Sequence, residues 1–358
     1  MESHSVCQHL LFVSDEPIQP LSAIDKSMLA PKQLEVDILH REHGLQGKGV
    51  EIAILDTGIL HSHEVFSSKK GKNPIDGCNF IGGDPPESWH TKPGLHGTAV
   101  AAIAAGNEYV SRRTQNEAGE IEQYIAGIAP RAKLYICRIS DGKTYPWTPM
   151  ANALQHLIDL KTKDPTRIDI VVMSFGGKSK DQEVEKKLKD LADLKVILLA
   201  AGGNDGDRPD NAHFPASNRN VIAVGAFGTG GHKTDFTTPH ACVYAPGKAI
   251  YVPSLATNSE ICTQDGTSFA APVVAGFLAL LLQCAKESDP DGSTKKVMDM
   301  YHNIDFLNDI FHDHELVSKD PGNHHRLFYA QAYLVRLREH PDNIIKLIQK
   351  LHSKEFTP

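Results

Sequence analysis

The 358-residue sequence lacks any apolar run long enough to cross a bilayer, which argues against a membrane-spanning helix. Its first ten residues contain no lysine or arginine, and the apolar stretch 10–13 is too short for the core of a signal peptide. The net charge of −7 is modest and argues against a nucleic-acid-binding surface. We therefore expect a cytoplasmic protein that binds neither membranes nor nucleic acids.

Cysteines are few, and the six present show no paired spacing, so no disulfides are expected. Cys137 falls in an expected strand and Cys284 in an expected helix, which predicts buried thiols. The nineteen histidines have no cysteine or histidine partner at zinc-binding spacing, so no metal site is predicted. Hydrophobic residues make up 41% of the chain and can bury a large core.

Apolar segments with strand character alternate with segments of helical character. Strands are predicted at 50–55, 133–139, 168–174, 196–200 and 221–225, and helices at 96–105, 149–161, 181–193 and 268–284. Continuous apolar strands separated by helices indicate a parallel sheet covered on both faces. We expect a three-layer αβα fold with a mainly parallel central sheet, and a polar surface insertion at 107–122.

Four residues in separate segments form a candidate catalytic set. Ser268 stands among small residues where an apolar helix is expected to begin, so the helix end would favour developing negative charge. Asp56 and Asn204 follow strands, where parallel sheets place their active sites, and His96 begins a helix of small residues. His96 would take the serine proton, Asp56 would hold the imidazole, and Asn204 with the Ser268 N–H would stabilise an oxyanion.

Each of these residues also has a purely structural explanation. Asp56 and Asn204 are typical turn residues, Ser268 is a typical helix N-cap, and His96 could bond to backbone. Taken together and in this order, the four favour catalysis.

The chain resembles the subtilisin-like serine proteases (subtilases, family S8) from about residue 47 to residue 334, and looks most like their intracellular members. The resemblance is carried by six blocks at 56–58, 96–98, 172–177, 221–226, 245–247 and 266–272. It implies a serine endopeptidase that hydrolyses peptide bonds of a peptide or protein substrate through an acyl-enzyme. It also implies that the substrate-binding residues are Ser174, Phe175, Gly176 and Gly203.

Gly203 leaves an open pocket for a large P1 side chain, the residue before the cleaved bond. Asp205, Asp207 and Asp210 follow it and could favour lysine or arginine there, or could form a solvated acidic loop. Many relatives bind calcium tightly through an aspartate in the loop after the catalytic one. Val65 stands at that position here, which makes such a site doubtful, and the triad chemistry requires no cofactor.

We expect a peptidase domain at 47–337, an N-terminal extension at 1–46 without a full-size prodomain, and a helical tail at 338–358. Residues 10–13 of the extension could lie across the cleft as a strand or form a surface arm. Two alternatives to a free enzyme stay open. The chain could be a peptide-binding module that does not cleave, or a peptidase regulated by a partner protein or fused domain.

Overall fold

In the computed structural model, the structure describes residues 44–69, 75–107, 127–206, 213–228, 233–239 and 241–288. It also describes residues 36, 39 and 40 and the short strand segments 10–11, 110–116, 119–125, 317–319 and 326–328. The predicted helical tail at 338–358 lies outside these residues.

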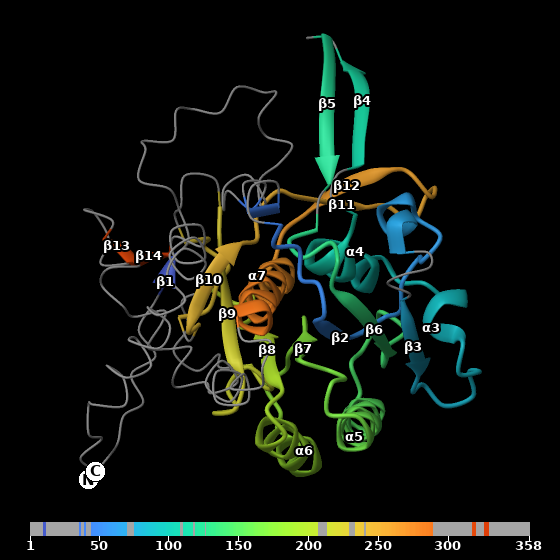
Figure 1. Ribbon diagram of the computed structural model, residues 1–358, viewed down its shortest axis with the longest axis vertical. Helices are drawn as coiled ribbons and strands as arrows, with labels where there is room; N and C mark the ends of the chain where they lie inside the picture. The colour runs from blue at the N-terminus through green and yellow to red at the C-terminus, as the bar shows by residue number, and fades with distance from the viewer. Residues whose placement is uncertain are drawn as a thin grey trace.

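The five predicted strands form the centre of one parallel sheet. They are β2 (Glu51–Asp56), β6 (Lys133–Arg138), β7 (Ile170–Met173), β8 (Ile197–Ala201) and β9 (Ile222–Phe227). Within the described residues the sheet has seven strands in the order β10-β9-β8-β7-β2-β6-β3, all paired in parallel (Figure 1). The predicted fold class is therefore confirmed.

The two edge strands were not predicted, and their composition explains why. β3 (Asp76–Asn79) is short, polar and partly exposed, and β10 (Val243–Pro246) is short and ends in proline. Neither has the long apolar run that marks a central strand, because an edge strand is covered on fewer sides and tolerates polar residues and proline.

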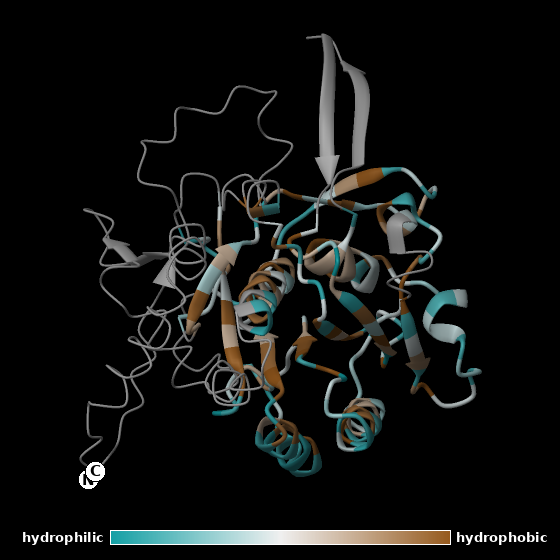
Figure 2. Cartoon of the chain, in the orientation of Figure 1, coloured by the Kyte–Doolittle hydropathy of each residue, from teal (hydrophilic) through white to brown (hydrophobic). Residues whose placement is uncertain are grey.

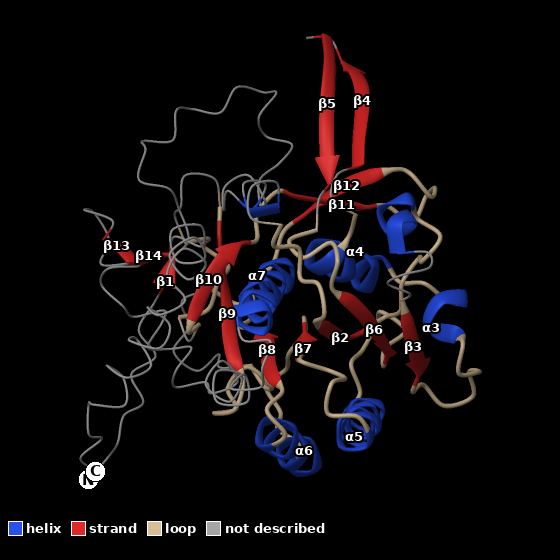
Figure 3. Cartoon of the chain, viewed as in Figure 1, coloured by secondary structure: helices blue, strands red, loops and turns tan. Residues whose placement is uncertain are grey.

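Four helices cover the two faces of the sheet (Figure 3). On one face lie α4 (Leu95–Ala105) and α7 (Thr267–Ser288), and on the other lie α5 (Trp147–Lys163) and α6 (Gln182–Asp193). Ile52 and Ile54 join the first core, whereas Ala53 and Leu55 join the second, because successive side chains of a strand point to opposite faces. In Figure 2, α6 carries hydrophilic residues on the side away from the sheet.

An antiparallel hairpin of β4 (Val110–Asn116) and β5 (Gly119–Ile125) occupies most of the predicted surface insertion at 107–122 and continues three residues beyond it. It projects from the body of the molecule in Figure 1. A second hairpin, β11 (Ile250–Pro253) and β12 (Ile261–Gln264), leads directly into α7. The short helices α3 (Ser88–Thr91) and η2 (Glu64–Lys69) lie in the segments between β2 and α4. None of the described helices has the length and apolar composition that crossing a membrane requires.

Part of the N-terminal extension is described. β1 (Leu10–Leu11) pairs in parallel with β14 (Arg326–Phe328), which also pairs with β13 (Val317–Lys319). Leu10 and Leu11 therefore contact the C-terminal part of the chain and do not pair with the cleft segment 174–177, whereas residues 12 and 13 lie outside the described part. The two interpretations of residues 10–13 stay predictions.

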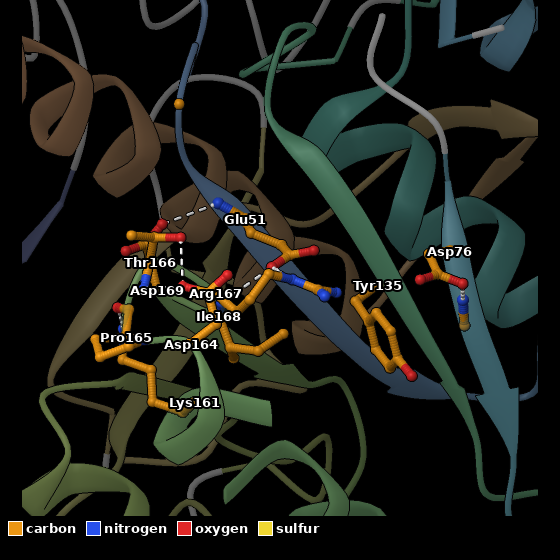
Figure 4. A network of polar contacts seen from close by, with 12 residues as sticks. Glu51, Asp76, Tyr135, Lys161, Asp164, Pro165, Thr166, Arg167, Ile168 and Asp169 are labelled. Atoms are coloured by element: carbon orange, nitrogen blue, oxygen red, sulfur yellow. Dashed lines mark hydrogen bonds and ion pairs between the residues drawn. The ribbon is translucent and has the colours of Figure 1, made fainter. Parts of the chain in front are cut away.

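A network of charged groups lies at the end of the sheet where β2 begins (Figure 4). The Glu51 carboxylate accepts from Arg167 Nε at 2.6 Å and from the Ile168 N–H at 3.0 Å. Asp169 accepts from the Glu51 N–H at 3.0 Å and from Lys286 of α7 at 3.1 Å. Because buried charges are stable only when paired, this network fixes the start of β2 relative to α7, and β2 ends at Asp56.

Among the described cysteines, Cys78, Cys137 and Cys262 are free thiols. Cys137 is fully buried, as predicted, whereas the side chain of Cys284 lies outside the described part.

Candidate active site

Asp56 and His96 are brought into direct contact at the end of β2. The His96 Nδ1–H donates to the Asp56 carboxylate, with 3.0 Å to Oδ1 and 2.9 Å to Oδ2. The Thr57 N–H also donates to Oδ1, at 2.7 Å. The Asp56 side chain is fully buried, whereas that of His96 is 30% exposed. A proton on Nδ1 leaves Nε2 unprotonated in the neutral ring, so Nε2 is the nitrogen that can accept a proton.

The helix that carries His96 lies very close to the end of β2, and glycine makes this possible. A Cβ placed on Gly97 would lie 2.4 Å from the Gly58 carbonyl oxygen, a distance that no side chain tolerates. The Gly97 N–H donates to Thr57 Oγ1 at 3.0 Å, which satisfies one of the amide groups at the helix start. The small residues that follow His96 thus serve close packing as well as helix formation.

The environment of His96 shifts its pKa. Burial alone would lower the pKa of His96, but the charge of Asp56 and its hydrogen bond favour the imidazolium more strongly. The net result is a pKa above the ordinary value of 6.5. His96 is therefore a stronger base than a free imidazole.

Ser268 is the second residue of α7, and its neighbours contact the other candidate residues. The Phe269 ring lies 5.5 Å from the His96 ring, between centroids. Thr267 bonds to Asn204, as described below. Ser174 Oγ donates to the backbone carbonyl of Ser268 at 2.7 Å. Ser268 itself is half-buried, whereas Gly266, Thr267 and Phe269 are buried. The serine thus remains accessible within a tightly held turn.

Asn204 follows β8 and is held by the start of α7. Its Oδ1 accepts from the Thr267 N–H at 2.9 Å and from Thr267 Oγ1 at 3.0 Å. Because Oδ1 accepts both bonds, the amide group Nδ2 points the other way, and it lies 3.3 Å from where a Cβ of Gly266 would stand. The Asn204 side chain therefore presents an N–H donor next to the turn that carries Ser268.

The predicted substrate-binding residues lie on two neighbouring segments. Gly176 follows β7, and Gly203, with a φ of 119°, follows β8. His213 stands between them: a Cβ on either glycine would lie 3.0 Å from a His213 side-chain atom. His213 Nε2 in turn lies 2.9 Å from Asp205 Oδ2. His213 was not predicted from the sequence, because it stands in no motif and only the fold brings it to these glycines.

Two further predicted residues have contacts that the sequence did not indicate. The Ser174 side chain is buried and bonds to the Ser268 turn, so it faces the protein interior. Phe175 is nearly buried, and its ring stacks on Tyr145, with centroids 4.5 Å apart and planes 13° apart. Asp207 and Asp210, the other members of the predicted acidic rim, lie outside the described residues.

The segment around Val65, where the family resemblance places a calcium ligand, makes hydrogen bonds within the protein. Val65 is fully buried, and its carbonyl accepts from the Asn107 N–H at 2.6 Å. The Asn107 side-chain amide donates to the Glu64 carbonyl and, at 2.8 Å, to Ser67 Oγ. Calcium needs six to eight oxygen ligands, and three oxygens of this segment already accept from Asn107. Within the described ranges, no three histidine, cysteine or acidic residues cluster as metal ligands would.

Comparisons with known proteins agree on one family. The model of the subtilase family matches residues 47–303. The chain is 30% identical to the major intracellular serine protease of Bacillus subtilis (strain 168), over 77% of this chain and 81% of that protein. It is 32% identical to an intracellular serine protease of Paenibacillus polymyxa, over 68% of this chain and 69% of that protein.

A solved structure agrees with this assignment. The prenylagaramide maturation protease PagA superposes with a TM-score of 0.53 at 25% identity, over 70% of this chain and 82% of PagA. The fold, the family match and these relatives lead to one conclusion: the chain belongs to the subtilase family and is a serine-type endopeptidase.

Proposed function

We propose that the enzyme hydrolyses peptide bonds with Ser268 as nucleophile, His96 as general base and Asp56 as the group that orients His96. The observation that carries this proposal is the bond from His96 Nδ1 to the buried Asp56 carboxylate. It fixes the tautomer in which Nε2 can accept the serine proton. The contact of His96 with Phe269, the residue next to Ser268, supports the same assignment.

The reaction follows from these roles. Ser268 Oγ attacks the substrate carbonyl carbon while His96 Nε2 takes the hydroxyl proton, and a tetrahedral oxyanion forms. His96 then gives the proton to the leaving amine, the C–N bond breaks, and an acyl-enzyme remains. Water, deprotonated by His96, attacks the ester, and the Ser268 oxygen leaves with the proton. Asp56 stays ionised throughout and stabilises the imidazolium.

We assign the oxyanion hole to Asn204 Nδ2 and the Ser268 N–H. Thr267 supports this assignment, because its two bonds to Asn204 Oδ1 hold the amide in one orientation before substrate arrives. A donor that is already oriented stabilises the developing charge without the cost of reorganisation during the reaction.

For the substrate, we propose that an extended peptide lies along 174–176 with its P1 side chain near Gly203. Asp205 is engaged by His213, so we do not expect its charge alone to select lysine or arginine. A library of peptides that vary at P1 would test this, and a preference for lysine or arginine over leucine or phenylalanine would contradict it.

We propose further that the chemistry needs neither a cofactor nor a tightly bound calcium ion. The segment at 64–67 supports this, because three of its oxygens already accept from the amide groups of Asn107. A cytoplasmic site of action is supported by the two relatives named as intracellular proteases. Regulation by a partner protein or a fused domain stays a hypothesis.

Labelling with a fluorophosphonate probe tests the proposed function. The probe should modify the wild-type protein and should leave Ser268→Ala unmodified, with cleavage of a casein substrate lost in the same variant. A folded wild-type protein that neither reacts with the probe nor cleaves casein would contradict the proposal and favour a peptide-binding module.

A further inference from the structure

Tyr145 contacts both members of the Asp56–His96 pair, although no motif includes it. Its hydroxyl donates to Asp56 Oδ1 at 3.3 Å and lies 3.4 Å from His96 Nδ1. Asp56 therefore has three partners: the Thr57 N–H, the His96 imidazole and the Tyr145 hydroxyl.

The ring of Tyr145 lies against the predicted substrate-binding segment. It stacks nearly parallel on Phe175, with the centroids 4.5 Å apart. A parallel stack at this distance restricts rotation of the ring and thereby aims the hydroxyl at Asp56. Tyr145 thus connects the predicted substrate-binding segment to the Asp56–His96 pair.

The loop that carries Tyr145 is held by its own side chains, even though most of it is exposed. Between β6 and α5, Ser140 Oγ accepts from the Gly142 N–H at 3.0 Å and donates to the Thr144 carbonyl. Asp141 accepts from the Lys143 N–H at 3.0 Å. Such local bonds stabilise one turn conformation, so Tyr145 is presented in a defined position without burial of the loop.

We infer that Tyr145 is a positioning residue of this active site, whose hydroxyl holds the Asp56 carboxylate and adjusts the basicity of His96. The inference rests on the proposed function of Asp56 and His96. The hydroxyl hydrogen places a positive dipole end beside Asp56 and His96 Nδ1, which offsets part of the carboxylate charge that favours the imidazolium. Removing it should therefore raise the pKa of His96.

The other charged and titratable groups near Asp56 and His96 leave the effect of the Tyr145 hydroxyl on the His96 pKa measurable. Burial first, and then the charge of Asp56, raise the pKa of Tyr145, so the hydroxyl keeps its proton at working pH. Arg138, the partner of Asp56 in the register of β6, binds Asp84 at 2.8 Å and Asn79 at 2.9 Å. From α7, the uncharged Phe269 faces His96.

The test compares Tyr145→Phe with a matched control, Tyr135→Phe. Tyr145→Phe keeps the stacked ring and removes only the hydroxyl. Tyr135 is a buried tyrosine whose hydroxyl bonds to His156 at 2.6 Å, on the face covered by α5, whereas Tyr145 is partly buried. For Tyr145→Phe, kcat should fall about threefold to tenfold, as expected for loss of one hydrogen bond, with little change in KM. The acidic limb of kcat/KM should move to higher pH, whereas Tyr135→Phe should match the wild type.

A second measurement does not depend on turnover. NMR titration of the His96 imidazole in the Ser268→Ala background should give a higher pKa with Tyr145→Phe than without it. Unchanged kcat, acidic limb and His96 pKa would overturn the inference, as would a rise in KM alone, which would make Tyr145 only a wall of the cleft. If the wild type does not react with fluorophosphonate but the His96 pKa still shifts, the proposed function fails and the inference about Tyr145 stands.

Discussion

Gln283 of α7 holds the segment that leads into β2, and its replacement should destabilise the whole domain. The side chain is 2% exposed. Its Oε1 accepts three backbone N–H groups, those of Gln46 at 2.7 Å, Gly47 at 2.7 Å and Lys48 at 3.0 Å. Its Nε2 donates to the Gly44 carbonyl at 3.2 Å and to Glu287 at 2.9 Å. One side-chain amide therefore supplies hydrogen-bond partners to most of the backbone polar groups in a turn that has no regular secondary structure.

The expected magnitude follows from the donors that a leucine would leave without an acceptor. The N–H groups of Gln46 and Gly47 belong to buried residues, whereas Lys48 is exposed and its N–H can bind water. Each buried donor without a partner costs about 1–3 kcal/mol, so the two together cost about 2–6 kcal/mol. Burial of the leucine side chain offsets part of this loss. We expect Gln283→Leu to lower the free energy of unfolding by about 2–4 kcal/mol.

Urea unfolding followed by circular dichroism measures this loss, in the Ser268→Ala background so that self-digestion does not interfere. Gln155→Leu in α5 is the matched control, because the same replacement at an exposed glutamine leaves no buried N–H group without an acceptor and should change stability little. The reasoning would be refuted if Gln283→Leu lay within about 1 kcal/mol of its parent, since that is less than one unsatisfied buried donor is expected to cost. A Gln155→Leu variant that loses as much stability as Gln283→Leu would refute it as well.

Four further predictions concern the active site. Gly97→Ala should abolish fluorophosphonate labelling, because its Cβ would meet a backbone carbonyl at 2.4 Å. Gly82→Ala, where a Cβ meets nothing within 4 Å, should label normally. Asn204→Ala should lower kcat by about 10²–10³ with KM nearly unchanged in steady-state kinetics, the range known for the corresponding change in a subtilisin. The acidic limb of kcat/KM should lie above pH 6.5, because the base must be neutral and the pKa of His96 is raised. Stability should change with pH in the opposite direction to activity. The Asp56–His96 interaction contributes fully to the free energy of unfolding below the unfolded-state pKa of His96, and its contribution is lost as pH rises through the folded-state pKa. Urea unfolding at a series of pH values would detect this loss.

Local signals in the sequence predicted much of the fold. The run from Ile52 to Leu55 is apolar at every position, as a strand buried on both faces must be, and it lies inside the sheet between β7 and β6. Asp181 marks the start of α6 correctly, because its side chain accepts from the Val184 N–H as an N-cap does. Segment 107–122 was predicted only as a polar insertion, since its pattern of polar residues does not indicate which strands pair.

The sequence by itself determined the family, the order of the strands and helices, and the residue types that the chemistry needs. These features depend on residues that are neighbours along the chain. A strand is recognised by its pattern of apolar residues, a helix by its capping residue, and a motif by the spacing of its residues. Tertiary structure alone decided that Tyr145 contacts Asp56, that His213 stands between two glycines, and that Gln283 holds the turn before β2. Each of these contacts is made by one side chain between positions that are separated in the chain. No local sequence pattern predicts such a contact, because it depends on how the helices pack on the sheet.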